Sequence, residues 1–344
     1  MRWLNYVAAL LLAPVSAAAA AGGHIFALSL NGTNNLPNLL AADLSTYEIR
    51  AGPPLAGVEL IGQACAVDAA GATLFAFGVV RGGGPEMLAL LAVDTRSGAL
   101  LRATNASAWP GAAGRLVFIE AIFADGGAPG AGAGALLVVA RAIPPGGGGG
   151  GGEQLVFRVD AATGAAALLG AVSVAAASDV AYDAARGLLY SIDPGANDDE
   201  SGSLNTIALA PAPRVVASVP LAAHFSFPQV LGPAAGALVG LTLATAPDGS
   251  FARNLTTIDA ATGAEASVAQ LGGGFYVVLE DGPKAIDAAG GRAFYMLATG
   301  PFGEFDVVAV DLATGAVGES VGLCGFIGCG PRSAACARRC APRP

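Results

Sequence analysis

A short motif that recurs along the chain constrains the fold more than any other feature. Each copy is an apolar run that ends in Asp, two variable residues and then Thr or Ser, followed by Gly in four of the five copies. The copies are centred on Asp43, Asp94, Asp160, Asp259 and Asp311. Asp accepts hydrogen bonds from the backbone just ahead of it, and Gly adopts the positive φ that closes a turn. Each copy therefore predicts a tight turn between two strands.

The spacing of the motif predicts a repeat architecture with a period of about 50 residues. The longer interval from Asp160 to Asp259 spans two periods, with a degraded copy at Asn205–Pro213 in which Pro211-Ala212-Pro213 replaces the turn. The interval before Asp160 contains the seven consecutive glycines Gly146–Gly152, which predict a flexible surface loop.

A second repeat, with Asp-Ala-Ala at Asp68, Asp183 and Asp287, lies between copies of the first and predicts another strand–turn–strand unit. Together the two repeats give four strands per period, the pattern of a β-propeller, in which each sheet buries its faces against its neighbours. The strand that follows each inner turn is predicted at Ile25–Leu30, Leu74–Val80, Leu136–Arg141, Leu188–Ile192, Ala237–Leu243 and Ala293–Ala298.

These patterns predict an all-β protein, a six-bladed β-propeller of four-stranded antiparallel blades at residues 24–330. The last outer strand is expected at Ala316–Gly322, and the segment Leu323–Cys329 after it is expected to become the inner strand of the first blade. This C-terminal strand would close the ring and remove exposed sheet edges. Residues 331–344 form a basic tail that contains cysteines.

At the motifs centred on Asp94, Asp160, Asp259 and Asp311, the chain resembles the YVTN/quinoprotein-like superfamily of β-propeller repeats. In that superfamily, a strand followed by Val-Asp-x-x-Thr-Gly and another strand marks the outer hairpin of a blade. The resemblance covers roughly residues 24–323 and implies an architecture, because propellers host unrelated functions.

The N-terminus predicts secretion. Met1–Gly23 has a basic residue at Arg2, an apolar core over Val7–Val15 and small residues suited to cleavage, as in a secretory signal peptide. The alternative, an uncleaved membrane anchor, needs about 20 apolar residues. The mature protein is therefore expected to be secreted or lumenal, without membrane insertion. Candidate glycosylation acceptors follow the Asn-x-Ser/Thr rule at Asn31, Asn105 and Asn254.

Charge excludes some partners. The chain has a net charge of −9, which disfavours nucleic acids and anionic membranes. An unknown protein or glycan is the expected partner, and the chain is expected to be a monomer.

The five cysteines predict disulfides in an oxidising compartment. They are Cys65, Cys324, Cys329, Cys336 and Cys340. If the C-terminal strand closes the ring, Cys65 lies beside Cys324 or Cys329, and a bridge there would clamp the ring. Local pairs, Cys336 with Cys329 or Cys340, are the other interpretation, and zinc is a rival to disulfides because Cys thiolates bind it.

Two groups of polar residues are candidate sites. The first lies near the start of the inner strands, which face the central channel, where converging polar groups form a ligand site or simply bind water. Its members are Gln63, Glu120, Asp179, Gln229 and Asp281. The second is an acidic loop that is either a Ca²⁺ site or a solvated surface loop, with the carboxylates Asp193, Asp198, Asp199 and Glu200.

The sequence contains none of the common catalytic motifs, and it has only two histidines, His24 and His224. The first hypothesis is therefore a binding or scaffold propeller that recognises a protein or glycan, and Ca²⁺ is the one candidate cofactor. The alternative is a Ca²⁺-dependent hydrolase or lactonase of the six-bladed type, with its site at the mouth of the channel. A pyrroloquinoline-quinone enzyme is a third interpretation, which only the repeat motif suggests.

Overall fold

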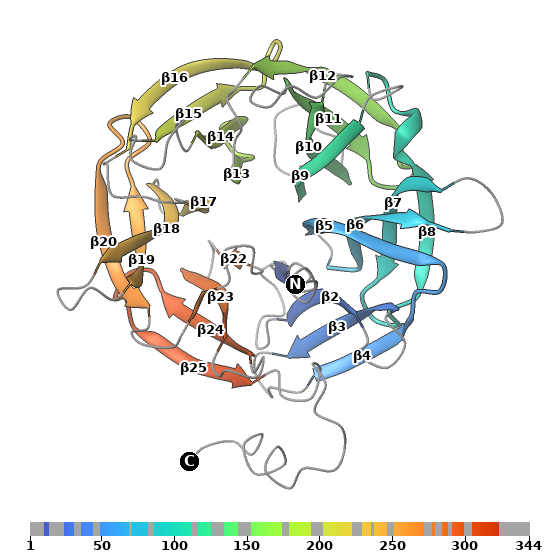
Figure 1. The fold of residues 1–344 in the computed structure, drawn as a ribbon, viewed down its shortest axis with the longest axis horizontal. Coiled ribbons are helices and arrows are strands. Elements are labelled where there is room, and N and C mark those ends of the chain that lie inside the picture. The colour runs from blue at the N-terminus through green and yellow to red at the C-terminus, as the bar shows by residue number, and fades with distance from the viewer. Residues whose placement is uncertain are drawn as a thin grey trace, which may run out of the picture.

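A computed structural model shows an all-β molecule in which six antiparallel sheets surround a common centre (Figure 1). One short helix, η1 (Ala106–Ala108), is present among the described residues. The structure describes residues 10–13, 24–30, 36–43, 49–68, 71–81, 86–111, 116–124, 134–143, 153–173, 179–193, 202–221, 229–234, 237–245, 251–271, 277–278, 284–287, 291–298 and 305–322.

The sheets are numbered in chain order, and the strands of each sheet are given from the innermost to the outermost (Figure 1). Sheet 1 contains β1 (Leu10–Ala13), β2 (His24–Leu30), β3 (Pro37–Asp43) and β4 (Ile49–Pro54). Sheet 2 contains β5 (Val58–Val67), β6 (Thr73–Val80), β7 (Met87–Asp94) and β8 (Leu100–Asn105). Sheet 3 contains β9 (Leu116–Ala124), β10 (Ala135–Ile143), β11 (Glu153–Asp160) and β12 (Ala166–Ser173).

The second half of the chain continues in the same way. Sheet 4 contains β13 (Asp179–Asp183), β14 (Leu188–Asp193), β15 (Ser203–Ala208) and β16 (Arg214–Pro220). Sheet 5 contains β17 (Gln229–Ala234), β18 (Ala237–Thr245), β19 (Phe251–Ile258) and β20 (Glu265–Leu271). Sheet 6 contains β21 (Val277–Val278) and β22 (Lys284–Asp287), which both pair with β23 (Arg292–Ala298), then β24 (Phe305–Asp311) and β25 (Val317–Gly322).

The prediction of an all-β propeller is confirmed. The six strands that were predicted to follow the inner turns correspond to β2, β6, β10, β14, β18 and β23. The inner strands contact one another in a closed series, from β1 through β5, β9, β13, β17 and β22 back to β1. Among the described strands, the innermost strands therefore form an uninterrupted ring around the centre.

The predicted closure by a C-terminal strand is wrong in this structure. Sheet 1 takes its inner strand from β1, which pairs antiparallel with β2 in the register Leu10 with Ala27 and Ala13 with His24. A nearby segment closes a much shorter loop than one at the far end of the chain, and loop-closure entropy favours the shorter loop. The segment Leu323–Cys329 and the tail at 331–344 lie outside the described residues.

The hydrophobic core is divided among the spaces between neighbouring sheets. Successive side chains of a strand point to opposite faces, so Leu74 packs against sheet 1 while Phe75 packs against sheet 3. Trp109 lies with Phe77 and Phe157 in the core between sheets 2 and 3, with ring centroids 5.7 and 5.4 Å from theirs. Because both faces of a sheet are buried, middle strands such as β10 are apolar at consecutive positions.

The recurring Asp motif forms the outer turns, as predicted. In the turn of sheet 3, the Asp160 carboxylate accepts hydrogen bonds from the Thr163 backbone N–H at 2.7 Å and from the Thr163 hydroxyl at 2.8 Å. Gly164 then takes a φ of 75° and donates its N–H to the Asp160 carbonyl at 2.7 Å. Equivalent turns are centred on Asp94, Asp259 and Asp311.

These bonds lower the pKa of all four Asp carboxyls. The largest cause is the hydroxyl of Ser97 for Asp94, of Thr163 for Asp160 and of Thr314 for Asp311, and the backbone N–H of Ala261 for Asp259.

Each outer turn also packs against the outer strand of the preceding sheet. A side chain added at Gly164 would collide with Thr104 of β8, and one added at Gly315 would collide with the Val268 carbonyl of β20. In sheet 4, where the turn is degraded as predicted, Pro213 takes this place and lies against Gly170 of β12. The same turn therefore forms the hairpin and spaces the neighbouring sheets.

Candidate functional site

The structure places four of the five predicted channel positions, and the fifth lies outside the described residues. Gln63, Glu120, Asp179 and Gln229 all lie on innermost strands. Asp179 and Gln229 begin their strands, as expected, whereas Gln63 and Glu120 lie in the interior of β5 and β9. Asp281 lies outside the described residues.

Glu120 is the channel position whose side chain the structure describes. It occupies a β-bulge of β9, because Ala121 pairs with Val139 while Ile119 already pairs with Ala140. A bulge places one extra residue in the strand and redirects its side chain. The carboxylate is thereby turned toward side chains of β10 and β11.

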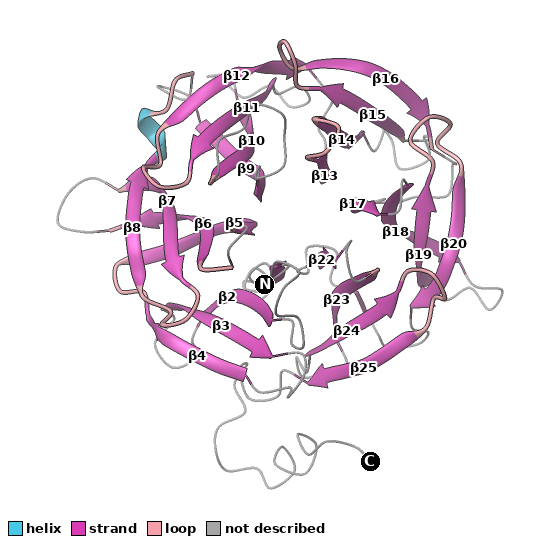
Figure 2. Cartoon of the chain, turned by 180° about the vertical axis from the view of Figure 1, so that it is seen from behind, coloured by secondary structure: helices cyan, strands magenta, loops and turns pink. Residues whose placement is uncertain are grey.

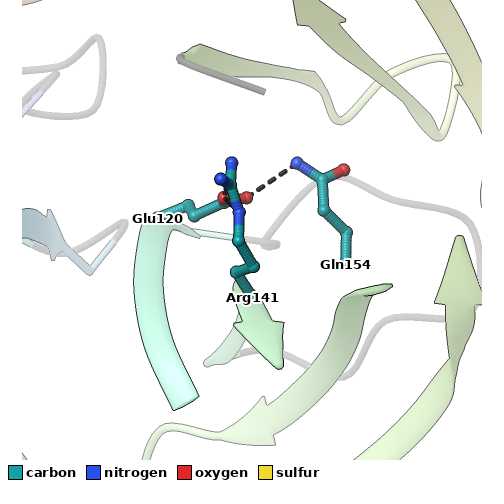
Figure 3. Close-up of polar contacts among 3 residues, drawn as sticks. All are labelled: Glu120, Arg141 and Gln154. Atoms are coloured by element: carbon teal, nitrogen blue, oxygen red, sulfur yellow. Dashed lines mark hydrogen bonds and ion pairs between the residues drawn. The ribbon is translucent and has the colours of Figure 1, made fainter. Parts of the chain in front are cut away.

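Two polar side chains of sheet 3 hold this carboxylate (Figure 3). Oε1 of Glu120 accepts a hydrogen bond from Nε of Arg141 at 2.6 Å and lies 2.5 Å from a terminal guanidinium nitrogen. Oε2 accepts a hydrogen bond from Nε2 of Gln154 at 2.7 Å. Arg141 and Gln154 face each other across the β10–β11 pair, so three successive strands contribute to one polar group.

The polar group is largely buried, but two of its side chains keep some contact with solvent. The side chains of Glu120 and Arg141 are 14% and 24% exposed, and Gln154 is 2% exposed. A charge at this depth is costly unless it is paired and hydrogen-bonded. Here the guanidinium neutralises the carboxylate and the amide binds its second oxygen. The arrangement can present fixed hydrogen-bonding groups to a ligand, while the carboxylate is already occupied on both oxygens.

The sequence analysis missed Arg141 and Gln154. A usable signal existed for Arg141, which interrupts an apolar run of six residues that begins at Ala135. A charge on a strand that is otherwise buried on both faces indicates a partner on a neighbouring strand. Gln154 carried a weaker signal, because a polar residue near the start of a strand is common at any surface.

The acidic loop is only partly described. Asp193 is the last residue of β14, and its side chain is half-buried. Asp198, Asp199 and Glu200 lie outside the described residues. Within the described part of the chain, no group of three or more His, Cys, Asp or Glu side chains is placed to hold a metal ion.

Cys65, one partner of the proposed clamp, lies in the core of the propeller. It is a buried thiol on β5, 6% exposed, in the core between sheets 1 and 2. Burial raises the pKa of the Cys65 thiol. The proposed bridge required a cysteine-bearing strand beside β2, where β1 lies instead. Cys324, Cys329, Cys336 and Cys340 lie outside the described residues, so their pairing stays a prediction.

Two of the three glycosylation candidates are described, and they differ in setting. Asn105 is exposed at the end of β8, where its side-chain oxygen caps η1 by accepting the Ser107 N–H at 3.0 Å. Asn254 is half-buried in β19 and is flanked by Thr242 and Gln270 on the paired strands. The surface position suits a bulky glycan better. Asn31 lies outside the described residues.

No helix in the described residues is long and apolar enough to cross a membrane.

The radial sheets, the closed series of inner strands and the repeated outer turns define a β-propeller protein. No protein-family model matches the chain, and no curated protein matches its sequence.

Solved structures that are similar to the chain share little sequence with it. One is a chain of the nidogen/laminin complex, with 12% identity and a TM-score of 0.49, where the match covers 86% of this chain and 92% of that one. Another is the β-propeller domain of the Trilobed protease from Pyrococcus furiosus, with 13% identity, a TM-score of 0.46 and coverage of 87% and 80%. A periplasmic gluconolactonase of Pseudomonas aeruginosa matches with 15% identity, a TM-score of 0.43 and coverage of 91% and 84%.

Proposed function

We propose that the protein is a secreted β-propeller of six blades, one for each sheet, which binds a protein or glycan at the mouth of its channel. The proposal of secretion rests on the signal-like segment Met1–Gly23 and is supported by the exposed sequon at Asn105. The choice of binding over catalysis rests on the chemistry of Glu120.

The pairing of Glu120 with Arg141 and Gln154 is the observation that carries the proposal. A Ca²⁺-dependent hydrolase needs carboxylate oxygens that can approach the ion to about 2.3–2.6 Å. Both oxygens of Glu120 are already bound, and the Arg141 guanidinium beside them repels a cation. A neutral, fixed group of donors and acceptors suits recognition, because a ligand gains hydrogen bonds without ordering flexible side chains.

Secretion has a structural consequence in sheet 1. Strand β1 lies inside the predicted signal peptide, so cleavage after residue 21 or 23 would remove the strand that pairs with β2. The secreted form would then expose the inner edge of β2. Mass spectrometry of the N-terminus of protein collected from the medium of a secreting host decides whether the mature chain retains β1.

The binding proposal is tested on the secreted protein with a glycan array and a panel of purified extracellular proteins. Glu120→Gln should weaken binding of any ligand found by about tenfold or more, the effect of about 1.4 kcal/mol. Asp311→Asn is the control, because it removes a carboxylate from an outer turn. Equal binding by wild type and Glu120→Gln would contradict a site at the mouth. Hydrolysis of a lactone that EDTA abolishes and Ca²⁺ restores would favour the alternative function.

A further inference from the structure

The outer rim of the propeller carries exposed apolar side chains at related positions. All the large apolar side chains that are exposed among the described residues belong to four strands, β8, β12, β16 and β25. These strands lie at the outside of the ring (Figure 2). They are Leu100, Leu101, Leu168, Val215, Val216 and Val317. Five of the six lie on the consecutive sheets 2, 3 and 4.

Strand β16 stands out on this rim because consecutive residues of its uncharged middle are exposed. It ends the order β13-β14-β15-β16, so one side of its backbone has no partner within the sheet. Its first five residues are all exposed. Natural edge strands are normally blunted by charges, prolines or covering segments within the strand. The stretch from Val215 to Val219 contains only Val, Ala and Ser.

Arg214 and Pro220 limit the unprotected part of β16 to the residues between them. Strand β8 carries a charge in its interior, Arg102, whereas β20, like β16, carries its charge at its first residue. Val219 of β16 packs into the core between sheets 4 and 5, as Leu169 of β12 packs into the core between sheets 3 and 4. Among the outer strands whose side chains are described, β16 has the longest run of exposed residues, 214–218.

We propose that β16 is a docking edge that takes up an extended apolar peptide segment of a partner protein as an additional strand. Backbone hydrogen bonds along β16 would bind the peptide, and alternate apolar side chains would contact Val215 or Val216. The edge of β16 would be a second binding surface beside the channel mouth, and its role rests on the binding function proposed above.

Size and charge favour a peptide over a second copy of the chain. A strand of seven residues is only about 23 Å long, and contact along it alone cannot approach the roughly 1,200 Å² of a stable interface between folded proteins. Two copies would also each bring a net charge of −9, which opposes close approach.

The ends of β16 define the polarity of the peptide. Arg214 begins the strand, while Pro220 at its end lies against Gly263, in the exposed turn that carries the Asp259 carboxylate. A peptide with basic residues beside Pro220 and none beside Arg214 therefore complements the edge. Antiparallel addition, which pairs more stably than parallel, places those basic residues at the peptide N-terminus.

The test uses the secreted protein and a fluorescein-labelled peptide that begins with two Lys and continues with alternating Val and Thr. Fluorescence anisotropy measures the binding. Val216→Lys should weaken binding by about tenfold or more, since it places a charge on the edge. The matched control is Val317→Lys on β25, a residue that is 54% exposed where Val216 is 50% exposed, and it should change the affinity less than about twofold.

Three results would overturn the proposal. They are equal binding by wild type and Val216→Lys, equal binding of a peptide with Pro at every second position, and a wild-type dimer in sedimentation that Val216→Lys dissociates. The last result would assign β16 to a second copy. Circular dichroism confirms that both variants are folded. Because Glu120 lies on the opposite, inner side of its sheet, loss of peptide binding would leave ligand binding at the channel mouth unaffected.

Discussion

Gly263, in the outer turn of sheet 5, lies directly against the backbone carbonyl of Pro220, the last residue of β16 in sheet 4. Its φ of 70° is itself favourable only for glycine. Glycine is therefore required at this position for two reasons. The hairpin needs a positive φ, and the neighbouring sheet leaves no room for a side chain.

Replacing Gly263 should be more costly than replacing a glycine that is required only for its positive φ. Gly187 has a φ of 64° but no atom within 4 Å of an added Cβ. We expect Gly187→Ala to lower the free energy of unfolding by about 1–2 kcal/mol, and Gly263→Ala by about 2 kcal/mol more because Pro220 must move. Urea unfolding measures both, and equal losses would show that the contact between sheets contributes nothing.

Arg102 should stabilise the boundary between sheets 2 and 3. Its guanidinium donates to the carbonyls of Ala161, at 2.6 Å, and Ala162 in the next outer turn. Arg102→Ala should cost about 1–2 kcal/mol of unfolding free energy, because hydrogen bonds from a charged donor are lost. The control is Arg81→Ala, which breaks ion pairs of an arginine that is 58% exposed and should cost less than about 1 kcal/mol. Chemical unfolding of both variants compares them.

Glu120 and Arg141 should be energetically coupled. Removing either charge leaves the other half-buried without its ion pair, whereas removing both does not. In a double-mutant cycle with Glu120→Gln and Arg141→Met, the double variant should be more stable than the sum of the single losses predicts, by about 1–2 kcal/mol. Additive losses would mean that the pair is solvated and does not organise the site.

Acid should weaken the outer turns. The pKa of Asp160 lies below its ordinary value of 3.8, chiefly because the Thr163 hydroxyl binds the ionised carboxylate. A carboxyl with a lowered pKa contributes its full stability above the unfolded value and loses it as the pH falls through the folded value. The difference in melting temperature between wild type and Asp160→Asn should therefore shrink from pH 6 to pH 2. A constant difference would mean that the charge of Asp160 is irrelevant to the turn.

Cys65 should resist thiol reagents in the folded protein. Its thiol is buried, and its raised pKa keeps the reactive thiolate scarce. Iodoacetamide labelling mapped by mass spectrometry should modify Cys65 only after unfolding in guanidinium. Modification of the native protein on the same timescale as a free cysteine would contradict the placement of β5, and a peptide linked through Cys65 would restore the clamp hypothesis.

The local chemistry of the chain determined the propeller architecture. The outer turns follow from Asp and Gly at a constant offset, because an Asp side chain and a positive φ act within a few residues. The strands that follow the inner turns were also predictable, because consecutive apolar residues of the required length can be buried only between sheets. Even the degraded turn at Pro211 and Pro213 was recognisable from the period.

Only the tertiary structure decided which segments meet across long distances. Leu10–Ala13 is apolar enough to serve as the core of a signal peptide or as a strand, and only the structure shows that this segment can pair with β2. The partners of Glu120 were equally hidden, since Arg141 and Gln154 are distant along the chain and a single bulge turns the carboxylate toward them. Pairing and register depend on contacts between segments that local sequence does not encode, and for that reason they appear only when the sheets are assembled.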